Sequence, residues 1–149
     1  MGNHAFVKKT KGMTPAGITQ LLNDLNQSRF YGKLSITMEG ENCWIIDLVE
    51  KGHEFVHLRC YIENKNFEMC HYHHGSLGWW VDNTIVNEVA LKFDGTISDD
   101  AGPETWKGRR GFRKTFREHM EAEIKSYGKY GSKMMFRLGM RSVPKEFRG

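Results

Sequence analysis

The sequence predicts an α+β fold in which an antiparallel meander of four to five strands is covered by helices, mainly on one face. Apolar and polar residues alternate through most of residues 30–74, which is the period of a half-buried strand. Apolar residues recur three and four apart in residues 14–27, 83–93 and 110–127, which is the period of a helix. The apolar content of 39% and the charged content of 27% are typical of a globular chain. We therefore expect a single domain over residues 1–149.

The first helix has a clear start. Residues 1–13 are expected to be a flexible basic lead-in. Thr14 can then cap a helix, and Pro15 suits the first helical position because it lacks an N–H that would have no partner there. Apolar residues follow on one face as far as about Gln27. This N-terminal helix is expected to be structural.

Three strands are expected next, at about 30–39, 42–49 and 53–62. Gly52 suits the left-handed position of a three-residue loop, which would pair Val49 with His53. A two-residue turn would shift the register by one and exchange the faces of the third strand. The three-residue loop is favoured because it gathers the apolar side chains on one face. These are Leu34, Ile36, Met38, Trp44, Ile46, Leu48, Val56, Leu58, Cys60 and Ile62. It would also pair Ile46 with Val56 and Trp44 with Leu58.

A fourth strand is expected at about 67–74, with Ile62 opposite Phe67, Cys60 opposite Met69 and Leu58 opposite His71. The core face then continues through Phe67 and Met69. The opposite face collects a set of aromatic, titratable and thiol side chains. These are Phe55, His57, Arg59, Tyr61, Glu68, Cys70, Tyr72 and His74.

The remaining elements follow from the same patterns. We expect a short edge strand at Trp79–Val81, a middle helix at Asn83–Phe93, a short fifth strand at Gly95–Ser98, a long C-terminal helix from Arg110 to Tyr127, and a basic, Met-rich tail at residues 132–149.

The cellular compartment is predicted from what the sequence lacks. No apolar run approaches the roughly 20 residues that span a bilayer, and the first residues contain no apolar signal segment. Three cysteines without a secretory signal favour free thiols in a reducing compartment. We expect a cytoplasmic protein with no membrane partner.

Charge divides the chain into two unequal parts. Residues 1–103 contain 9 Lys/Arg and 13 Asp/Glu, a sum of −4, whereas residues 104–149 contain 13 and 5, a sum of +8. This asymmetry indicates an anionic partner for the C-terminal third, namely nucleic acid, a nucleotide or an acidic protein surface. The alternative is that the two parts pack on each other. The candidate anion-binding residues are Arg109, Arg110, Arg113, Lys114 and Arg117.

The aromatic and basic sheet face is a second candidate surface. Its candidate binding residues are Phe55, His57, Arg59, Tyr61 and Tyr72. Aromatic rings on an open sheet can stack bases at roughly 1–3 kcal/mol each, while the basic groups meet phosphate. The alternative is that a helix or a second copy of the chain covers this face.

Two metal sites are alternatives, and no cofactor is predicted beyond them. His57, Cys70 and His74 share a face and could hold zinc, with Glu68 nearby, although the paired CxxC or HxxxH spacing of specific zinc sites is absent. The acidic loop could hold magnesium, although loops are commonly acidic. Its carboxylates are Asp94, Asp99, Asp100 and Glu104.

These observations favour a small, basic, non-enzymatic binding protein that engages an anionic partner. A metal-assisted hydrolase of phosphate esters is one alternative. A self-assembling or inhibitory protein, of the kind found among small viral accessory proteins, is another. No nucleophile elbow, Walker A loop or HExxH motif is present, so no catalytic residue is predicted.

Overall fold

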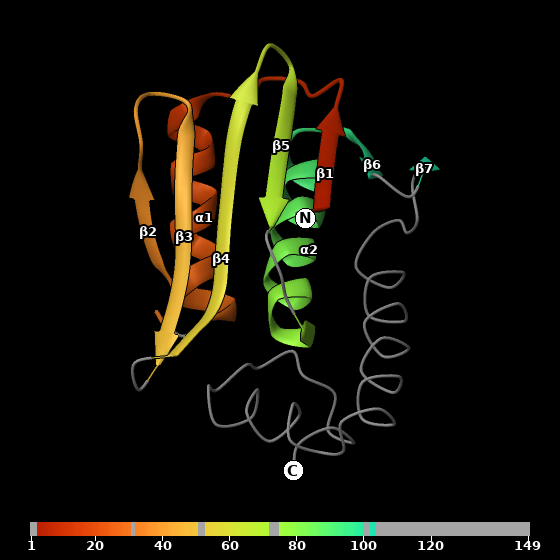
Figure 1. The fold of residues 1–149 in the computed structure, drawn as a ribbon. Helices are drawn as coiled ribbons and strands as arrows, with labels where there is room; N and C mark the ends of the chain where they lie inside the picture. Colours follow the sequence, from red (N-terminus) through yellow and green to blue (C-terminus); the bar gives the residue numbers. More distant parts are fainter. Residues whose placement is uncertain (1–2, 31, 51–52, 72–74, 100–101, 104–149) are drawn as a thin grey trace.

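The computed structural model describes residues 3–30, 32–50, 53–71, 75–99 and 102–103. Within them the chain has an α+β fold built on one antiparallel sheet with the strand order β2-β3-β4-β5-β1-β6-β7 (Figure 1). The strands are β1 (Asn3–Lys8), β2 (Ser35–Met38), β3 (Cys43–Glu50), β4 (His53–Glu63), β5 (Asn66–His71), β6 (Thr96–Asp99) and the two-residue β7 (Gly102–Pro103). The meander expected from the sequence is therefore its β2-to-β5 part.

Two helices of the described residues cover one face of this sheet. Helix α1 (Pro15–Arg29) lies behind the β2 and β3 side, and α2 (Gly75–Lys92) lies behind β5 and β1 (Figure 1). The Trp44 indole N–H donates to Thr19 Oγ1 at 3.0 Å, which ties β3 to α1. The helices contact each other through an ion pair of 3.5 Å between Arg29 and Glu88. No helix of the described residues covers the opposite face, called the outer face below.

The first residues of the chain are not the flexible lead-in that the sequence predicts. Residues 3–8 form β1, which pairs with β5 on one side and with β6 on the other. Ala5 and Val7 are buried in the core, whereas His4 and Phe6 lie on the outer face. The reason is that the side chains of this short segment alternate between the core and the outer face, as they do in a strand. Its basic residues begin only at Lys8, where the strand ends.

The pairing of β3 with β4 differs from the expected register by two residues. Ile46 pairs with Leu58 and Trp44 with Cys60, not with Val56 and Leu58. The turn pairs Glu50 with His53, and a bulge between Leu48 and Val49 then restores the face of β4. The expected buried face is therefore right although the expected partners are wrong.

The pairing of β4 with β5 agrees with the sequence prediction. Ile62 pairs with Phe67, Cys60 with Met69, and Leu58 with His71. The core between the sheet and the two helices includes Trp44, Ile46, Leu48, Val56, Leu58, Phe67 and Met69, together with apolar residues of both helices. Met38 is an exception, because its side chain is exposed near the end of the edge strand β2.

Thr14 caps α1 as expected, because its side chain accepts a hydrogen bond of 3.0 Å from the Gly17 N–H. Helix α2, in contrast, begins at Gly75 and includes Trp79–Val81, where the sequence predicts an edge strand.

The short fifth strand that the sequence predicts is present as β6. The expected long C-terminal helix and the basic tail lie outside the described residues. No helix in the described part of the chain is both long and apolar enough to cross a membrane.

Candidate functional site on the outer sheet face

The outer face of the sheet carries the titratable side chains that the core excludes. Because neighbouring strands are in register, Asp47 lies beside His57, Arg59 beside Cys70, and Cys70 beside His4. The described side chains of this face include Ile45, Asp47, His57, Arg59, Tyr61, Glu68, Cys70, His4 and Phe6. Apart from Cys70, which is buried, these side chains are partly exposed.

Basic side chains on this face are bonded to carboxylates. The Arg59 guanidinium donates to Glu39 at 3.0 Å, and His57 Nδ1 lies 2.5 Å from Asp47 Oδ1. The sheet places His57 and Asp47 directly opposite each other on β4 and β3. These pairs offset much of the positive charge that the sequence places on this face.

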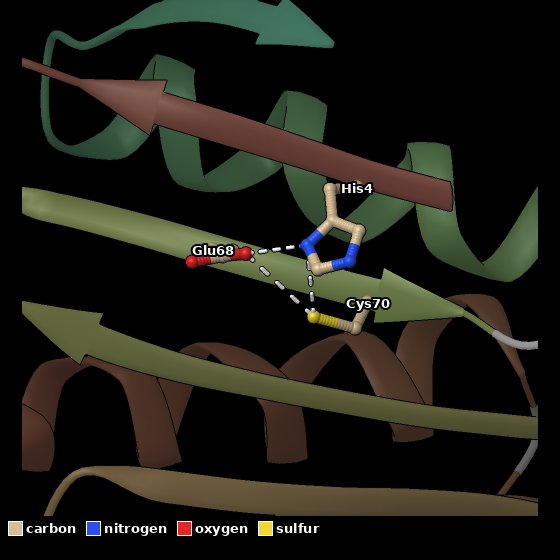
Figure 2. A group of neighbouring side chains, drawn as sticks. All are labelled: His4, Glu68 and Cys70. Atoms are coloured by element: carbon tan, nitrogen blue, oxygen red, sulfur yellow. Dashed lines mark hydrogen bonds and ion pairs between the residues drawn. The ribbon is translucent and has the colours of Figure 1, made fainter. Parts of the chain in front are cut away.

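Three side chains from β1 and β5 converge on one point (Figure 2). His4 Nδ1 lies 2.5 Å from Glu68 Oε1 and 3.4 Å from Cys70 Sγ, and this sulfur lies 3.8 Å from the same carboxylate oxygen. All three donor atoms thus lie within 4.8 Å of one another, which makes His4, Glu68 and Cys70 a candidate ligand set. We call them the His4–Glu68–Cys70 cluster.

The strand register explains this convergence. His4 pairs directly with Cys70 across the β1–β5 ladder, and Glu68 precedes Cys70 by two residues, so it projects from the same face. His4 and Cys70 are 66 residues apart in the sequence. The cluster therefore exists only because β1 inserts between β5 and β6.

Tyr61 of β4 contacts the cluster through Glu68, on the side away from His4. It pairs with Glu68 across the β4–β5 ladder, and its hydroxyl donates to Oε2, the oxygen of Glu68 that does not face His4. Burial and this hydrogen bond raise the pKa of Tyr61, so the hydroxyl keeps its proton. The Glu68 carboxylate is consequently held between Tyr61 on one side and His4 on the other.

The cluster does not have the geometry of a nucleophilic Cys-His-Glu triad. In such a triad the two ring nitrogens separate the thiol from the acid, whereas here Glu68 and Cys70 both contact Nδ1 of His4. Burial, and next the Glu68 carboxylate, raise the pKa of the Cys70 thiol to about 11. A thiol with a raised pKa is a weak nucleophile at neutral pH. The arrangement therefore lacks triad geometry, and its three ligand-type atoms form a candidate cation site.

The structure brings together only part of the metal set expected from the sequence. Cys70 has His4 and Glu68 as its neighbours, whereas His57 lies against Asp47, and His74 lies outside the described residues. His4 was missed because the lead-in was expected to be flexible. The sequence signal that could have identified His4 is the two-residue period from His4 to Lys8. In a strand, this period places Ala5 and Val7 on the core face and His4 on the opposite face.

The candidate residues of the sheet face, the acidic loop and the C-terminal third also lie partly inside and partly outside the described residues. His57, Arg59 and Tyr61 lie on the outer face, Phe55 is a residue of β4, and Tyr72 lies outside the described residues. In the acidic loop, Asp94 forms an exposed ion pair of 2.9 Å with Lys11. Asp100, Glu104 and the whole C-terminal set lie outside the described residues. That set is Arg109, Arg110, Arg113, Lys114 and Arg117.

Comparison with known proteins assigns no family: the chain matches neither a protein-family model nor a curated protein.

Proposed function

We propose that the protein is a non-enzymatic binding protein whose C-terminal third engages an anionic partner, with single-stranded RNA as the first candidate. The observation that carries this proposal is the division of charge. Residues 104–149 sum to +8, whereas residues 1–103 sum to −4. A local excess of this size attracts polyanions and accelerates their association.

The ion pairs on the outer face favour an anion-binding site in another part of the chain. Arg59 is bonded to Glu39 and His57 to Asp47, so an anion would have to displace a carboxylate in either place. In the sequence, residues 109–117 contain five Lys/Arg and no Asp/Glu. The lack of triad geometry around Cys70 favours binding over covalent catalysis.

The proposal is tested by fluorescence anisotropy of a labelled single-stranded RNA titrated with the full chain. The test variant combines Arg109→Gln, Arg110→Gln and Arg113→Gln. The matched control combines Lys8→Gln, Lys9→Gln and Lys33→Gln, which removes equal charge from exposed positions of the described part. We expect the test variant alone to weaken binding by at least tenfold, and to reduce the salt slope by roughly two, because each phosphate contact contributes about 0.7.

Equal losses of RNA affinity in the two variants would show that only net charge matters, and that Arg109, Arg110 and Arg113 form no specific binding site. Undetectable binding of RNA at low salt would remove the RNA partner. Parallel titrations with a labelled nucleotide and with an acidic peptide then decide between the other anionic partners. If neither bound, the proposed function would fall.

Metal-assisted hydrolysis of phosphate esters is the second candidate function, and the His4–Glu68–Cys70 cluster favours it. A metal ion held by three protein ligands can keep one position for water and lower the pKa of that water. The test is hydrolysis of p-nitrophenyl phosphate by the full chain with added Zn²⁺, with Cys70→Ser as the comparison. Turnover that does not depend on Cys70 would end this candidate.

A further inference from the structure

We propose that the His4–Glu68–Cys70 cluster is a site for one zinc ion, held by Nδ1 of His4, a carboxylate oxygen of Glu68 and the Cys70 thiolate. This inference stands apart from the anionic partner proposed above, because it concerns other residues and a ligand of opposite charge. The cluster combines the three ligand types that zinc takes in proteins: imidazole nitrogen, carboxylate oxygen and thiolate sulfur. Zinc is favoured over magnesium or calcium because those ions take oxygen ligands.

The distances between the donor atoms are close to those that zinc requires. With bonds of about 2.0–2.3 Å and tetrahedral angles, two zinc ligands lie about 3.3–3.6 Å apart. The observed separations are 3.4 Å from Nδ1 to sulfur and 3.8 Å from sulfur to Oε1. Only the third, 2.5 Å from Nδ1 to Oε1, is short. It must widen by about 0.8 Å to admit the ion.

The surroundings suit this small rearrangement. His4 and Cys70 are fixed as direct partners across two strands, so the adjustment falls to the longer Glu68 side chain. Tyr61 donates to the other oxygen of that carboxylate, which is the outer-shell contact that orients a metal-ligating acid. As zinc binds, the Cys70 S–H bond breaks, its proton leaves to solvent, and the sulfur lone pair bonds to the metal.

Burial gives the site a closed side and an accessible side. Cys70 is 6% exposed, and the Glu68 side chain is 14% exposed, whereas the His4 side chain is 41% exposed. An ion would enter beside His4, with the sulfur and the carboxylate beneath it. Three ligands from this cluster leave a fourth tetrahedral position for water or an external ligand.

The decisive experiment uses the untagged full chain and two probes, Zn²⁺ alone and Co²⁺ alone. Zinc retained after desalting is counted by mass spectrometry, and its affinity is measured against a chromophoric chelator. Cobalt reports the ligands, because a bound thiolate gives a charge-transfer band in the near ultraviolet. We expect one equivalent of zinc and a cobalt spectrum that contains this band.

The variants carry matched controls from the same face. Cys70→Ser and His4→Gln should each weaken zinc binding by at least tenfold, and Cys70→Ser should abolish the cobalt band. Cys43→Ser and His57→Gln should change neither, because Cys43 is a partly exposed thiol outside the cluster and His57 is the other described histidine held 2.5 Å from a carboxylate. Tyr61→Phe should weaken zinc by about tenfold, as the loss of an outer-shell contact does.

The proposal is overturned if no zinc is retained, if cobalt binds without the thiolate band, or if Cys43→Ser removes that band. It is also overturned if binding survives in both Cys70→Ser and His4→Gln. Circular dichroism of each metal-free variant checks its fold. The wild-type cobalt spectrum decides the thiolate question even if a variant fails to fold.

Discussion

The Asn26 side chain of α1 hydrogen-bonds to both backbone groups of Leu34, just before β2. Its amide donates to the Leu34 carbonyl at 3.0 Å, and its Oδ1 accepts from the Leu34 N–H at 3.0 Å. Both residues are buried, and the Asn26 carbonyl also accepts from the Phe30 and Gly32 N–H groups. One asparagine therefore fixes the connection between the first helix and the edge of the sheet.

Replacing Asn26 with Ala should lower the free energy of unfolding by about 2–4 kcal/mol, because two buried backbone groups of Leu34 lose their partners. Urea denaturation measures this loss. The control is Asn23→Ala, which changes an exposed asparagine of the same helix and should cost well under 1 kcal/mol. Similar losses in both variants would show that the Asn26 bonds contribute little.

Gly95 lies directly against Val7, and an added Cβ would overlap Cγ1 of Val7 and lie 3.2 Å from the Lys8 carbonyl oxygen. Gly95→Ala should therefore destabilise the fold by about 1–3 kcal/mol through overpacking beside β1. The informative control is a double-mutant cycle with Val7→Ala, measured by denaturation. The cost of Gly95→Ala should be smaller when Val7 is already Ala. An unchanged cost would mean that the clash is not with this side chain.

Thr14 is the cap of α1, so Thr14→Ala should remove about 1 kcal/mol of stability by leaving the Gly17 N–H without this acceptor. Thr14→Ser keeps the acceptor oxygen and is the matched control, expected within a few tenths of a kcal/mol of wild type. Thermal or urea unfolding distinguishes them. If serine were as damaging as alanine, the threonine methyl group, not the cap, would be responsible.

The sequence predicts local features of this fold better than long-range ones. The cap at Thr14 and the register from Ile62–Phe67 to Leu58–His71 both depend on neighbours within a turn or a hairpin, and both are found. The bulge beside Val49 was not predictable from the turn residues alone. It appears because the core must bury Val56 and Leu58 together with Leu48. Face selection thus outweighed the turn preference.

Two larger differences have the same physical origin. Residues 3–8 form a strand with β5 and β6 on either side of them, and the short alternation of their side chains does not show which strands they pair with. Helix α2 extends back to Gly75 and includes Trp79–Val81, where the sequence predicts an edge strand, because α2 packs against β1, β4 and β5. Tertiary packing overrides the low helix propensity of its two glycines. The candidate site depends on the first of these differences: the sequence prediction includes Cys70 and Glu68, whereas the pairing of His4 with Cys70 is seen only in the folded sheet.

Cys60 should make the folded protein less stable at alkaline pH. Its thiol is fully buried between the sheet and the helices, and burial raises its pKa above the ordinary value of 9.0. In the unfolded chain the thiol ionises near pH 9, whereas in the folded chain it stays protonated. The unfolded state therefore binds fewer protons above this pH, and stability must fall as pH rises.

The expected slope from this one group is about 1.4 kcal/mol per pH unit above pH 9. Other groups also titrate there, so the measurement is a comparison of wild type with Cys60→Ala by urea denaturation at pH 8 and pH 10. Cys60→Ala should be less stable at pH 8, because it leaves a small cavity, but should lose less on going to pH 10. Cys43→Ala, which changes a partly exposed thiol, should retain most of the wild-type slope. If wild type and Cys60→Ala lost the same stability between the two pH values, the thiol would not stay protonated in the folded protein.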